Sequence, residues 1–575
     1  MSSNAPGLPL HHNNSVQRRT ATTSSSNGTA LNDDRPHIER RPTTPVDGRA
    51  LDEKRIDEPM YKYAWRRFRG TDRKLPTVGE SLKNMATHTI LNVLFVFVPV
   101  SWAVHFVVGA DGQPRYGPEV RFSLAFLAII PLEKMFDWLA EEMIPFIGAE
   151  LGDLLEITLN NAVEAALAIF LLTKDRYRLL QTTIVGVVLL HLLLIPGVAF
   201  MTGGARIFEQ ELHHGTTELN HSLLTLGVMT LVLPAAFFAA LDRGTLSDLT
   251  QFALRLNANQ PLASESGEAG GEGGSSTASA VAETATAAAE HALRALSSIV
   301  RRAEGSVEHE DPQEFIHGRF EFAALLTDQR RGHFLHFSHA LAFLLLGCYV
   351  CSRVYLHNPP GQGNALQMNK NTSNHIKQLA QEKENRNPKV GPYVGAIAII
   401  VCVALMAVTA EWLVDSIEPL QETSGIAQEW FGLFLLPIIS WAADGLLAFI
   451  YFVMRLLRRR VPPPEGVASG LAIDLSIQFL LFWMPLLVMI GWWSHKPFLL
   501  LFDLLEVVVL VAACFLVNFV TADAKTNWAE GAVLVAFYIM IAVVSWFYPG
   551  QPEVRIFNGR LTVTDALLNG PSVEG

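Results

Sequence analysis

The feature that most constrains this 575-residue chain is a series of apolar runs, each about 20 residues long and nearly free of charged side chains. Hydrophobic residues make up 50% of the chain and charged residues only 17%, so the charges gather between the runs. An α-helix of about 20 apolar residues crosses the hydrocarbon core of a lipid bilayer. The sequence therefore predicts an all-α, polytopic membrane protein.

We expect about eleven transmembrane helices. They are predicted at residues 88–110, 121–143, 150–173, 178–202, 219–241, 333–356, 391–415, 427–456, 467–493, 498–521 and 527–549. The basic run from Lys54 to Lys74 favours a cytoplasmic N-terminus, and the run from Arg455 to Arg460 falls on the same side of the membrane. An odd number of spans leaves the C-terminus on the opposite side.

Two of these spans share a polar motif. The residues from Gly152 to Glu164 and those from Gly432 to Asp444 both end in a small-residue step followed by a carboxylate. The next span of each half also carries polar residues. Five spans per half with polar groups in matching places are typical of an inverted-repeat transporter. We therefore expect two inverted five-helix repeats preceded by one N-terminal helix.

Composition then divides the chain into eight parts. Residues 1–80 are too polar to bury a core, which predicts a disordered tail. The parts are the cytoplasmic tail (1–80), the first transmembrane helix (81–120), the start of the first repeat (121–241), a polar insertion (242–332), the last helix of the first repeat (333–356), a central loop (357–390), the second repeat (391–549) and a C-terminal tail (550–575).

The carboxylates within the spans are the strongest candidates for function. An ionisable group at membrane depth costs about 2.5–3.5 kcal/mol, so its presence indicates a role. In inverted repeats, Glu164 and Asp444 are predicted to face each other near the bilayer midplane. Two carboxylates at that depth suit a divalent cation or two protons.

Further oxygen ligands follow from helical spacing. Glu156, Asn160 and Glu164 recur every four residues and share one face, as do Asp474 and Gln478. Hard cations such as Ca²⁺ bind several oxygen ligands of this kind. Glu156 is either such a ligand or a group at a hydrated helix entrance, and the same two readings apply to Asp474.

Three more residues have two readings each. His191 is either a proton carrier or ligand, because its reference pKa is near 6.5, or a hydrogen-bonding partner between helices. Glu142 and Glu411 lie in the spans before the two motifs. They either line the entrances to the site or lie at the membrane interface.

At these residues the chain resembles the cation/proton exchanger family, the vacuolar Ca²⁺/H⁺ antiporter type of the Ca²⁺/cation antiporter superfamily. The resemblance covers residues 85–550 except the insertion 242–332. It is strongest in the segments 154–169, 232–237 and 412–418, and from Ser476 through residues 527–531 to Pro549. It implies an all-α exchanger that moves a cation against protons and has no cofactor.

The family's signatures map onto this sequence with changes. Gly-Asn-Ala-Val-Glu falls on residues 160–164, so Asn161 and Glu164 match the family's cation ligands while Asn160 stands in place of the glycine. Gly-Asn-Ala-Ala-Glu-His falls on residues 440–445, where Asp444 keeps a carboxylate but the asparagine and histidine are lost.

The following spans have changed as well. The family's Gly-Ser…Ser-Asn pattern ends at Leu190-His191, and its Gly-Ser-Ser-Ile-Gln reads Asp474-Leu475-Ser476-Ile477-Gln478. A histidine and an acid thus replace hydroxyl and amide ligands. These changes indicate a divergent member whose ion preference or coupling has altered.

The resulting hypothesis is a secondary active transporter of an internal membrane, with Ca²⁺/H⁺ exchange as its reaction. Glu164 and Asp444 would bind the cation or protons in turn, supported by Asn161, Ser476 and Gln478. Two rivals stay open, a monovalent Na⁺ or K⁺/H⁺ exchanger and a non-transporting membrane regulator. A vacuolar location is implied by the resemblance alone.

The sequence also argues against other classes of function. The net charge of −11 is spread over tail, loops and spans, and no basic patch with interleaved aromatic residues indicates a nucleic-acid partner. No Ser/His/Asp set, HExxH motif or phosphate-binding glycine loop indicates an enzyme. The expected partners are small cations, protons and the lipid bilayer, and the sequence defines no oligomeric state.

Overall fold

A computed structural model describes nine stretches of the chain, all within one compact unit, Met60–Gly575. The described residues are 60–70, 74–107, 114–204, 210–211, 214–241, 327–357, 386–457, 471–523 and 525–559. Most of the predicted tail, insertion, central loop and C-terminal tail lies outside these residues.

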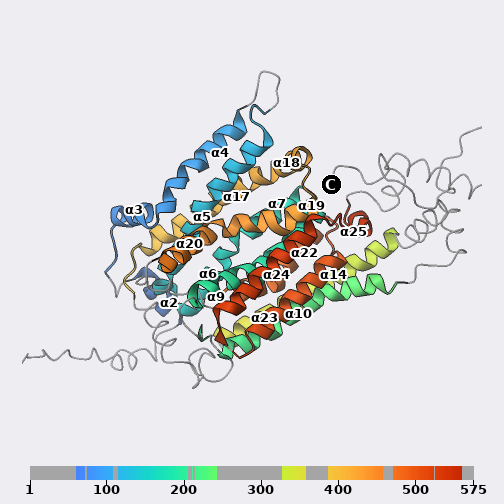
Figure 1. The fold of residues 1–575 in the computed structure, drawn as a ribbon. Helices are drawn as coiled ribbons and strands as arrows, with labels where there is room; N and C mark the ends of the chain where they lie inside the picture. The colour runs from blue at the N-terminus through green and yellow to red at the C-terminus, as the bar shows by residue number, and fades with distance from the viewer. Residues whose placement is uncertain are drawn as a thin grey trace, which may run out of the picture. The chain divides into compact units, whose positions relative to one another are not determined.

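The described residues are almost entirely helical, as predicted (Figure 1). The helices before the central loop are α2 (Met60–Arg69), α3 (Val78–Thr87), η2 (Ile90–Val96), α4 (Phe97–Phe106), α5 (Pro118–Ile147), α6 (Ala149–Asn160), α7 (Ala162–Thr173), α8 (Tyr177–Leu189), η3 (Leu190–Leu194), α9 (Ile195–Gly204), α10 (His214–Ala239) and α14 (Asp328–His357). Those after it are α17 (Pro392–Asp415), α18 (Ile417–Ser424), α19 (Gln428–Trp430), η4 (Phe431–Leu435), α20 (Leu436–Leu457), α21 (Leu471–Gln478), η5 (Phe479–Trp483), α22 (Met484–Trp493), α23 (Leu504–Val520), α24 (Trp528–Trp546) and α25 (Pro552–Phe557).

Length and apolar composition identify six of the described helices as able to cross a membrane, or nine spans if three bent helix pairs each count as one. Every one of the eleven predicted spans contains helix. The smaller number found by length and composition results from charged residues or short length in particular helices. Helix α5 carries Glu133, Lys134 and Asp137 inside its apolar stretch, and α23 has only 17 residues. The described chain is thus a mostly helical membrane protein.

Two features of the described chain were not predicted. Residues 60–69, expected to belong to the disordered tail, form α2, whose Arg67 Nε donates a hydrogen bond to the carbonyl oxygen of Pro145 at 3.4 Å. In addition, β1 (Gln210–Glu211) pairs antiparallel with β2 (Lys525–Thr526). This short pair connects the segment after α9 with the turn before α24.

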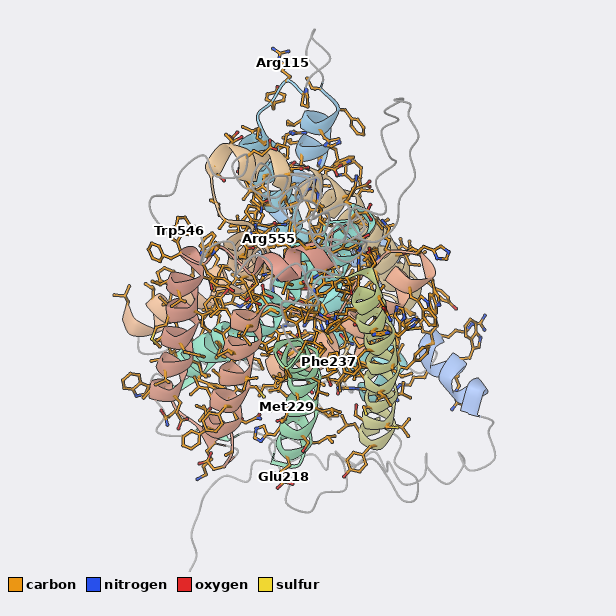
Figure 2. All side chains as sticks on the ribbon, turned by 90° about the vertical axis from the view of Figure 1, so that its right-hand side faces the viewer. Arg115, Glu218, Met229, Phe237, Trp546 and Arg555 are labelled. Atoms are coloured by element: carbon orange, nitrogen blue, oxygen red, sulfur yellow. The ribbon has the colours of Figure 1, made fainter. Side chains whose placement is uncertain are left out.

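Large apolar side chains on the outer faces of the helices are about half exposed. Met229 and Phe237 on α10 are 46% and 53% exposed, and Trp546 at the end of α24 is 51% exposed (Figure 2). The helices α8 and α21, in contrast, are buried over most of their length. Apolar surface of this extent on a bundle of long helices fits contact with lipid.

Gly186 allows the buried helices α8 and η4 to approach closely. A Cβ atom on Gly186 in α8 would lie 2.4 Å from the carbonyl oxygen of Leu433 and 2.8 Å from that of Gly432 in η4. Close backbone contact at small residues is a common way for membrane helices to pack. It brings α8, which follows the first motif, against the helix that contains the second.

We expect Gly186→Ala to lower the stability of the purified protein by about 1–3 kcal/mol, because the methyl group would collide with two backbone oxygens that cannot move independently. Gly347→Ala on α14 is the matched control, since nothing lies within 4 Å of its added Cβ. Thermal melting in detergent measures both. Equal melting temperatures for the two variants would contradict this account of the helix crossing.

Candidate ion-binding site

The site is organised by a break between α6 and α7. Asn161 has φ −92° and ψ 5°, outside the helical region, and the two helices bend by 51° around it. Glu164 lies in the first turn of α7, where the positive end of the helix dipole favours an anion. The side chains of Asn161 and Glu164 are both buried.

Asn161 is fixed by a network of side-chain amides. Its Nδ2 donates to Gln478 Oε1 at 2.8 Å and to the Leu475 carbonyl oxygen at 3.3 Å. Gln478 Nε2 in turn donates to Thr158 Oγ1 at 3.0 Å and to the Tyr349 hydroxyl at 3.1 Å. Both hydrogen bonds that Asn161 itself makes use its amide nitrogen as the donor. Its Oδ1 is buried without a hydrogen-bond partner in the described structure.

Glu164 and His191 form the next part of the site. His191 Nε2, on the π-helical segment η3, lies 3.6 Å from Glu164 Oε1, which is too long for a hydrogen bond. Glu164 Oε2 and His191 Nδ1 are both buried and have no partner among the described residues. Because π-helical turns are frequent at functional sites, the position of His191 supports its selection from the sequence.

Three ionisable residues of α5 also belong to the site, and the sequence analysis missed them. Lys134 Nζ donates to Asp137 Oδ2 at 2.5 Å and to Asp444 Oδ1. Glu133 is 7% exposed, its Oε2 has no partner within the described residues, and its carboxylate feels the charges of Lys134, Asp137, Asp444 and Glu164. The available signal was three charges within five residues of the apolar span 121–143.

Asp444 therefore has a partner that the sequence analysis did not anticipate. It was expected to face Glu164, but its carboxylate is paired with Lys134, while the basic neighbour of Glu164 is His191. The Asp444 side chain is also 49% exposed, on the segment of α20 after a 66° bend. The two carboxylates are connected through α5, where both act on Glu133.

Asn160 and Glu156 lie on the α5 side of the break. In the amide orientation that satisfies its hydrogen bonds, Asn160 donates to Asp137 Oδ1 at 2.6 Å and to the Glu156 carbonyl oxygen at 3.2 Å. Asn160 and Asn161 therefore point to different partners although they are adjacent. The Glu156 side chain is half-buried.

The other candidates on α21 have partners on neighbouring helices or on their own backbone. The Ser476 hydroxyl is buried and donates to the Ala472 carbonyl oxygen at 3.3 Å. The Asp474 carboxylate interacts with Asn220 of α10 and Arg353 of α14. Asp474 thus connects three helices.

Glu142, a candidate entrance residue, anchors the segment before α17. It is 1% exposed, pairs with Arg386 and accepts a hydrogen bond from the Lys389 backbone N–H at 2.6 Å. These contacts hold residues 386–389 against the end of α5. This carboxylate is fully engaged in the structure.

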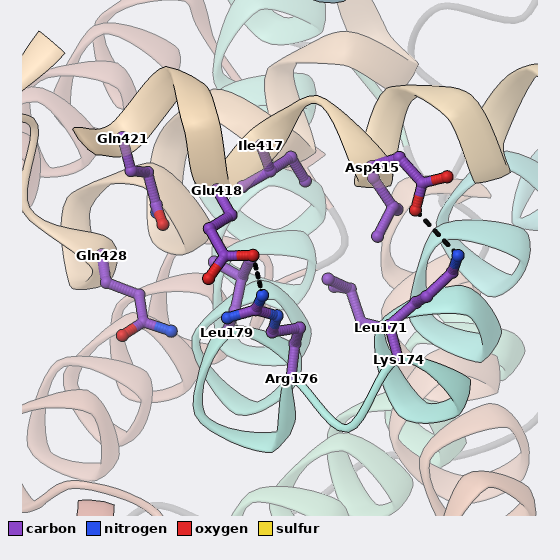
Figure 3. Close-up of a pocket in the computed structure, with 10 residues that line it drawn as sticks. Leu171, Lys174, Arg176, Leu179, Asp415, Ile417, Glu418, Gln421 and Gln428 are labelled. Carbon is purple, nitrogen blue, oxygen red and sulfur yellow. Dashed lines mark hydrogen bonds and ion pairs between the residues drawn. The ribbon is translucent and has the colours of Figure 1, made fainter. Parts of the chain in front are cut away.

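Glu411, the second candidate entrance residue, does not itself line the polar cavity of about 220 Å³ that Figure 3 shows, but it lies near one of the residues that do. Lys174 lines this cavity, with its Nζ 3.9 Å from Glu411 and 2.8 Å from Asp415. The hydrogen bond to Asp415 raises the pKa of Lys174. Arg176 and Glu418 pair across the same cavity, which opens at the C-terminal end of α7.

The unpaired atoms indicate what the site can bind. Glu164 Oε2, Asn161 Oδ1 and Glu133 Oε2 are buried oxygen acceptors without partners in the described part of the chain. Two carboxylates and an amide are ligands that hard cations prefer. Within the same part, no three His, Cys, Asp or Glu side chains converge as a complete metal site. Water and backbone oxygens would have to complete the coordination.

A second buried charge cluster differs because its carboxylates are paired. Arg178 Nη2 lies 2.7 Å from Glu506 and 3.5 Å from Asp503, and its Nε lies 3.8 Å from Glu429. Glu429 also pairs with Arg555 of α25 at 2.5 Å. This cluster holds α8, α19, α23 and α25 together.

Apolar helices that break around buried carboxylates define an integral membrane protein of the ion-transporting class. The family model "Sodium/calcium exchanger protein" matches residues 394–547. The chain is 31% identical to the vacuolar calcium ion transporter of Cryptococcus neoformans over 84% of its own length and 78% of that protein's. It therefore belongs to the cation/proton exchanger family.

More distant relatives have similar coverage. A Ca²⁺/H⁺ antiporter of Synechocystis is 26% identical over 80% of this chain and 98% of that protein. The solved structure of native YfkE is 18% identical, with a TM-score of 0.49, and covers 80% of this chain and 100% of that one.

We expect Arg178→Met to lower stability by about 3–5 kcal/mol, because it would leave buried carboxylates without a counter-charge. Arg176→Met, which removes a partly exposed pair with Glu418, should change stability by at most about 1 kcal/mol. Thermal melting with added lipid compares the two variants. If Arg178→Met melts with the wild type, the cluster is not the structural anchor inferred from its pairing.

Proposed function

We propose that this protein is a Ca²⁺/H⁺ antiporter of an internal membrane. The observation that carries the proposal is the buried Glu164 carboxylate at a helix break, with unpaired oxygens on Glu164, Asn161 and Glu133. Ion transporters use discontinuous membrane helices to build binding sites of this kind. Relatives named as calcium ion transporters and Ca²⁺/H⁺ antiporters support Ca²⁺ as the cargo.

The vacuolar membrane is the proposed location. Two fungal relatives, from Cryptococcus neoformans and Schizosaccharomyces pombe, are named vacuolar calcium ion transporters, and a plant relative is named a vacuolar cation/proton exchanger. A cytoplasmic N-terminus follows from the basic residues before the first span. With an acidic lumen, protons leaving the vacuole would drive the cation into it.

We further propose eleven spans, with two inverted five-helix repeats after the first. Helix breaks near Asn161 and Asp444 support this layout, since each falls within one of the two related motifs. The π-helical segments η3 and η5 support it as well, because each lies within the span that follows a motif. Matching irregularities in the two halves are expected of a repeat built around a central site.

Exchange would result from competition for the same oxygens. A buried carboxylate without a cation avoids the cost of an isolated charge by binding a proton. When Ca²⁺ binds Glu164 and its neighbours, these protons leave and are carried in the opposite direction. The cavity lined by Leu171 lies about 10 Å along α7 from Glu164, which makes it a candidate access route.

A monovalent cation/H⁺ exchanger is the second candidate. The ion pair between Lys134 and Asp444 favours it, because a fixed positive charge lowers the net negative charge available for a divalent ion. Comparison of Ca²⁺ with Na⁺ and K⁺ in one assay separates the two candidates. Absence of exchange with every cation would support a non-transporting regulator instead.

We expect Glu164→Gln to abolish Ca²⁺-driven proton release from acidified vesicles containing the purified protein, because the amide can neither release a proton nor neutralise the cation. Glu422→Gln, on the exposed face of α18, should retain wild-type release and controls for the loss of one carboxylate. A pH-sensitive dye reports the release. Wild-type activity in Glu164→Gln would refute the assignment of this carboxylate.

A further inference from the structure

Lys134 of α5 lies between two carboxylates that share its positive charge. Its side chain is 11% exposed and its Nζ donates to both Asp137 and Asp444, so one ammonium group is shared by two carboxylates. Asp137 also accepts from Asn160, whose neighbour Asn161 belongs to the unpaired oxygen set. A Lys ammonium is a compact point charge and is comparable in this respect to a bound metal ion.

Three other oxygens of the candidate site have no positively charged partner and no hydrogen-bond donor among the described residues. Glu133 precedes Lys134 in the chain, yet its Oε2 has no partner in the described structure, and the same holds for Glu164 Oε2 and Asn161 Oδ1. The acids around Lys134 thus fall into two groups, Asp137 and Asp444, which pair with its ammonium group, and the buried Glu133 and Glu164, which each keep an unpaired oxygen. The four carboxyl groups Glu133, Asp137, Glu164 and Asp444 thus outnumber the single ammonium group of Lys134 by three.

From this division we infer that Lys134 is a tethered cation that fills one of two adjacent cation positions and thereby limits the protein to cargo at the Glu133, Asn161 and Glu164 position. The inference rests on the proposed function, whose cargo it uses. It makes Lys134 a specificity-determining residue. Asp137 and Asp444 would be cation ligands that are already occupied.

The test is the number of Ca²⁺ ions bound per chain, measured by isothermal titration calorimetry with CaCl₂ on the purified full-length protein. Lys134→Met should bind one Ca²⁺ more than the wild type, because Asp137 and Asp444 become available. Lys134→Arg keeps the charge and should bind the wild-type number. Lys134→Met combined with Asp444→Asn should lose the additional ion.

Lys496→Met is the matched control, since Lys496 also pairs with an aspartate, Asp175, but in the turn after α7. It should leave the number of bound Ca²⁺ ions unchanged. A Lys134→Met variant that binds no additional ion would overturn the inference. This includes a variant that binds the same number of Ca²⁺ ions more tightly, because that result would show only that the Lys134 charge repels Ca²⁺ from a distance.

Thermal melting supplies a second measurement if Lys134→Met is poorly stable. Asp137 and Asp444 would lose their counter-charge in this variant, which should lower its melting temperature without Ca²⁺. Added Ca²⁺ should then raise the melting temperature of the variant more than that of the wild type. An equal Ca²⁺ response would count against the inference. The change in the number of bound Ca²⁺ ions on mutation tests the role of Lys134, whereas Ca²⁺ binding by the wild type tests the proposed cargo. The two hypotheses can therefore fail separately.

Discussion

The free-energy cost of placing charges inside an apolar helix bundle is the constraint on which this structure depends. Most of the buried carboxylates described above have found a counter-charge or donor, as Glu142 has with Arg386 and Glu506 has with Arg178. These pairs connect distant parts of the chain and are explained as anchors. Glu133 and Glu164 keep an unpaired oxygen and form no ion pair with an arginine or lysine among the described residues, unlike Glu429, whose one unpaired oxygen belongs to a carboxylate held by two arginines.

The same constraint explains why the helices break where they do. A straight helix would keep the side chains of α6 and α7 in one regular array. The break instead places Glu164 at a helix N-terminus and leaves Asn161 to be fixed by Gln478. Close packing at Gly186 brings the second motif helix against the same region. The helix break and the glycine contact thus both bring polar side chains of the two motifs into one buried region.

Much of this arrangement could be predicted from the sequence, because apolar runs locate membrane helices and a polar residue inside a run is conspicuous. Asn161, Gln478 and Glu164 were selected in this way, and the structure places the first two in direct contact. The pairing of Asp444 with Lys134 was not predictable, since it joins residues 310 positions apart. Lys134 lies outside the two related motifs, and a lysine is not an oxygen ligand, so the pattern of carboxylates and amides did not point to it.

The second motif shows how one substitution depends on another. The family pattern ends in a histidine, and this chain has Gly445 at that position. A Cβ atom on Gly445 would lie 2.7 Å from the Trp441 ring, so the tryptophan that replaces the family's asparagine leaves no room for a larger side chain there. Two potential ligands were therefore exchanged for one aromatic ring and a glycine. Asp444 is the remaining acid of this motif, and Lys134 supplies the charge that compensates it. The acid of the second motif thus forms an ion pair with Lys134, while Glu164 and Asn161 of the first motif keep unpaired oxygens.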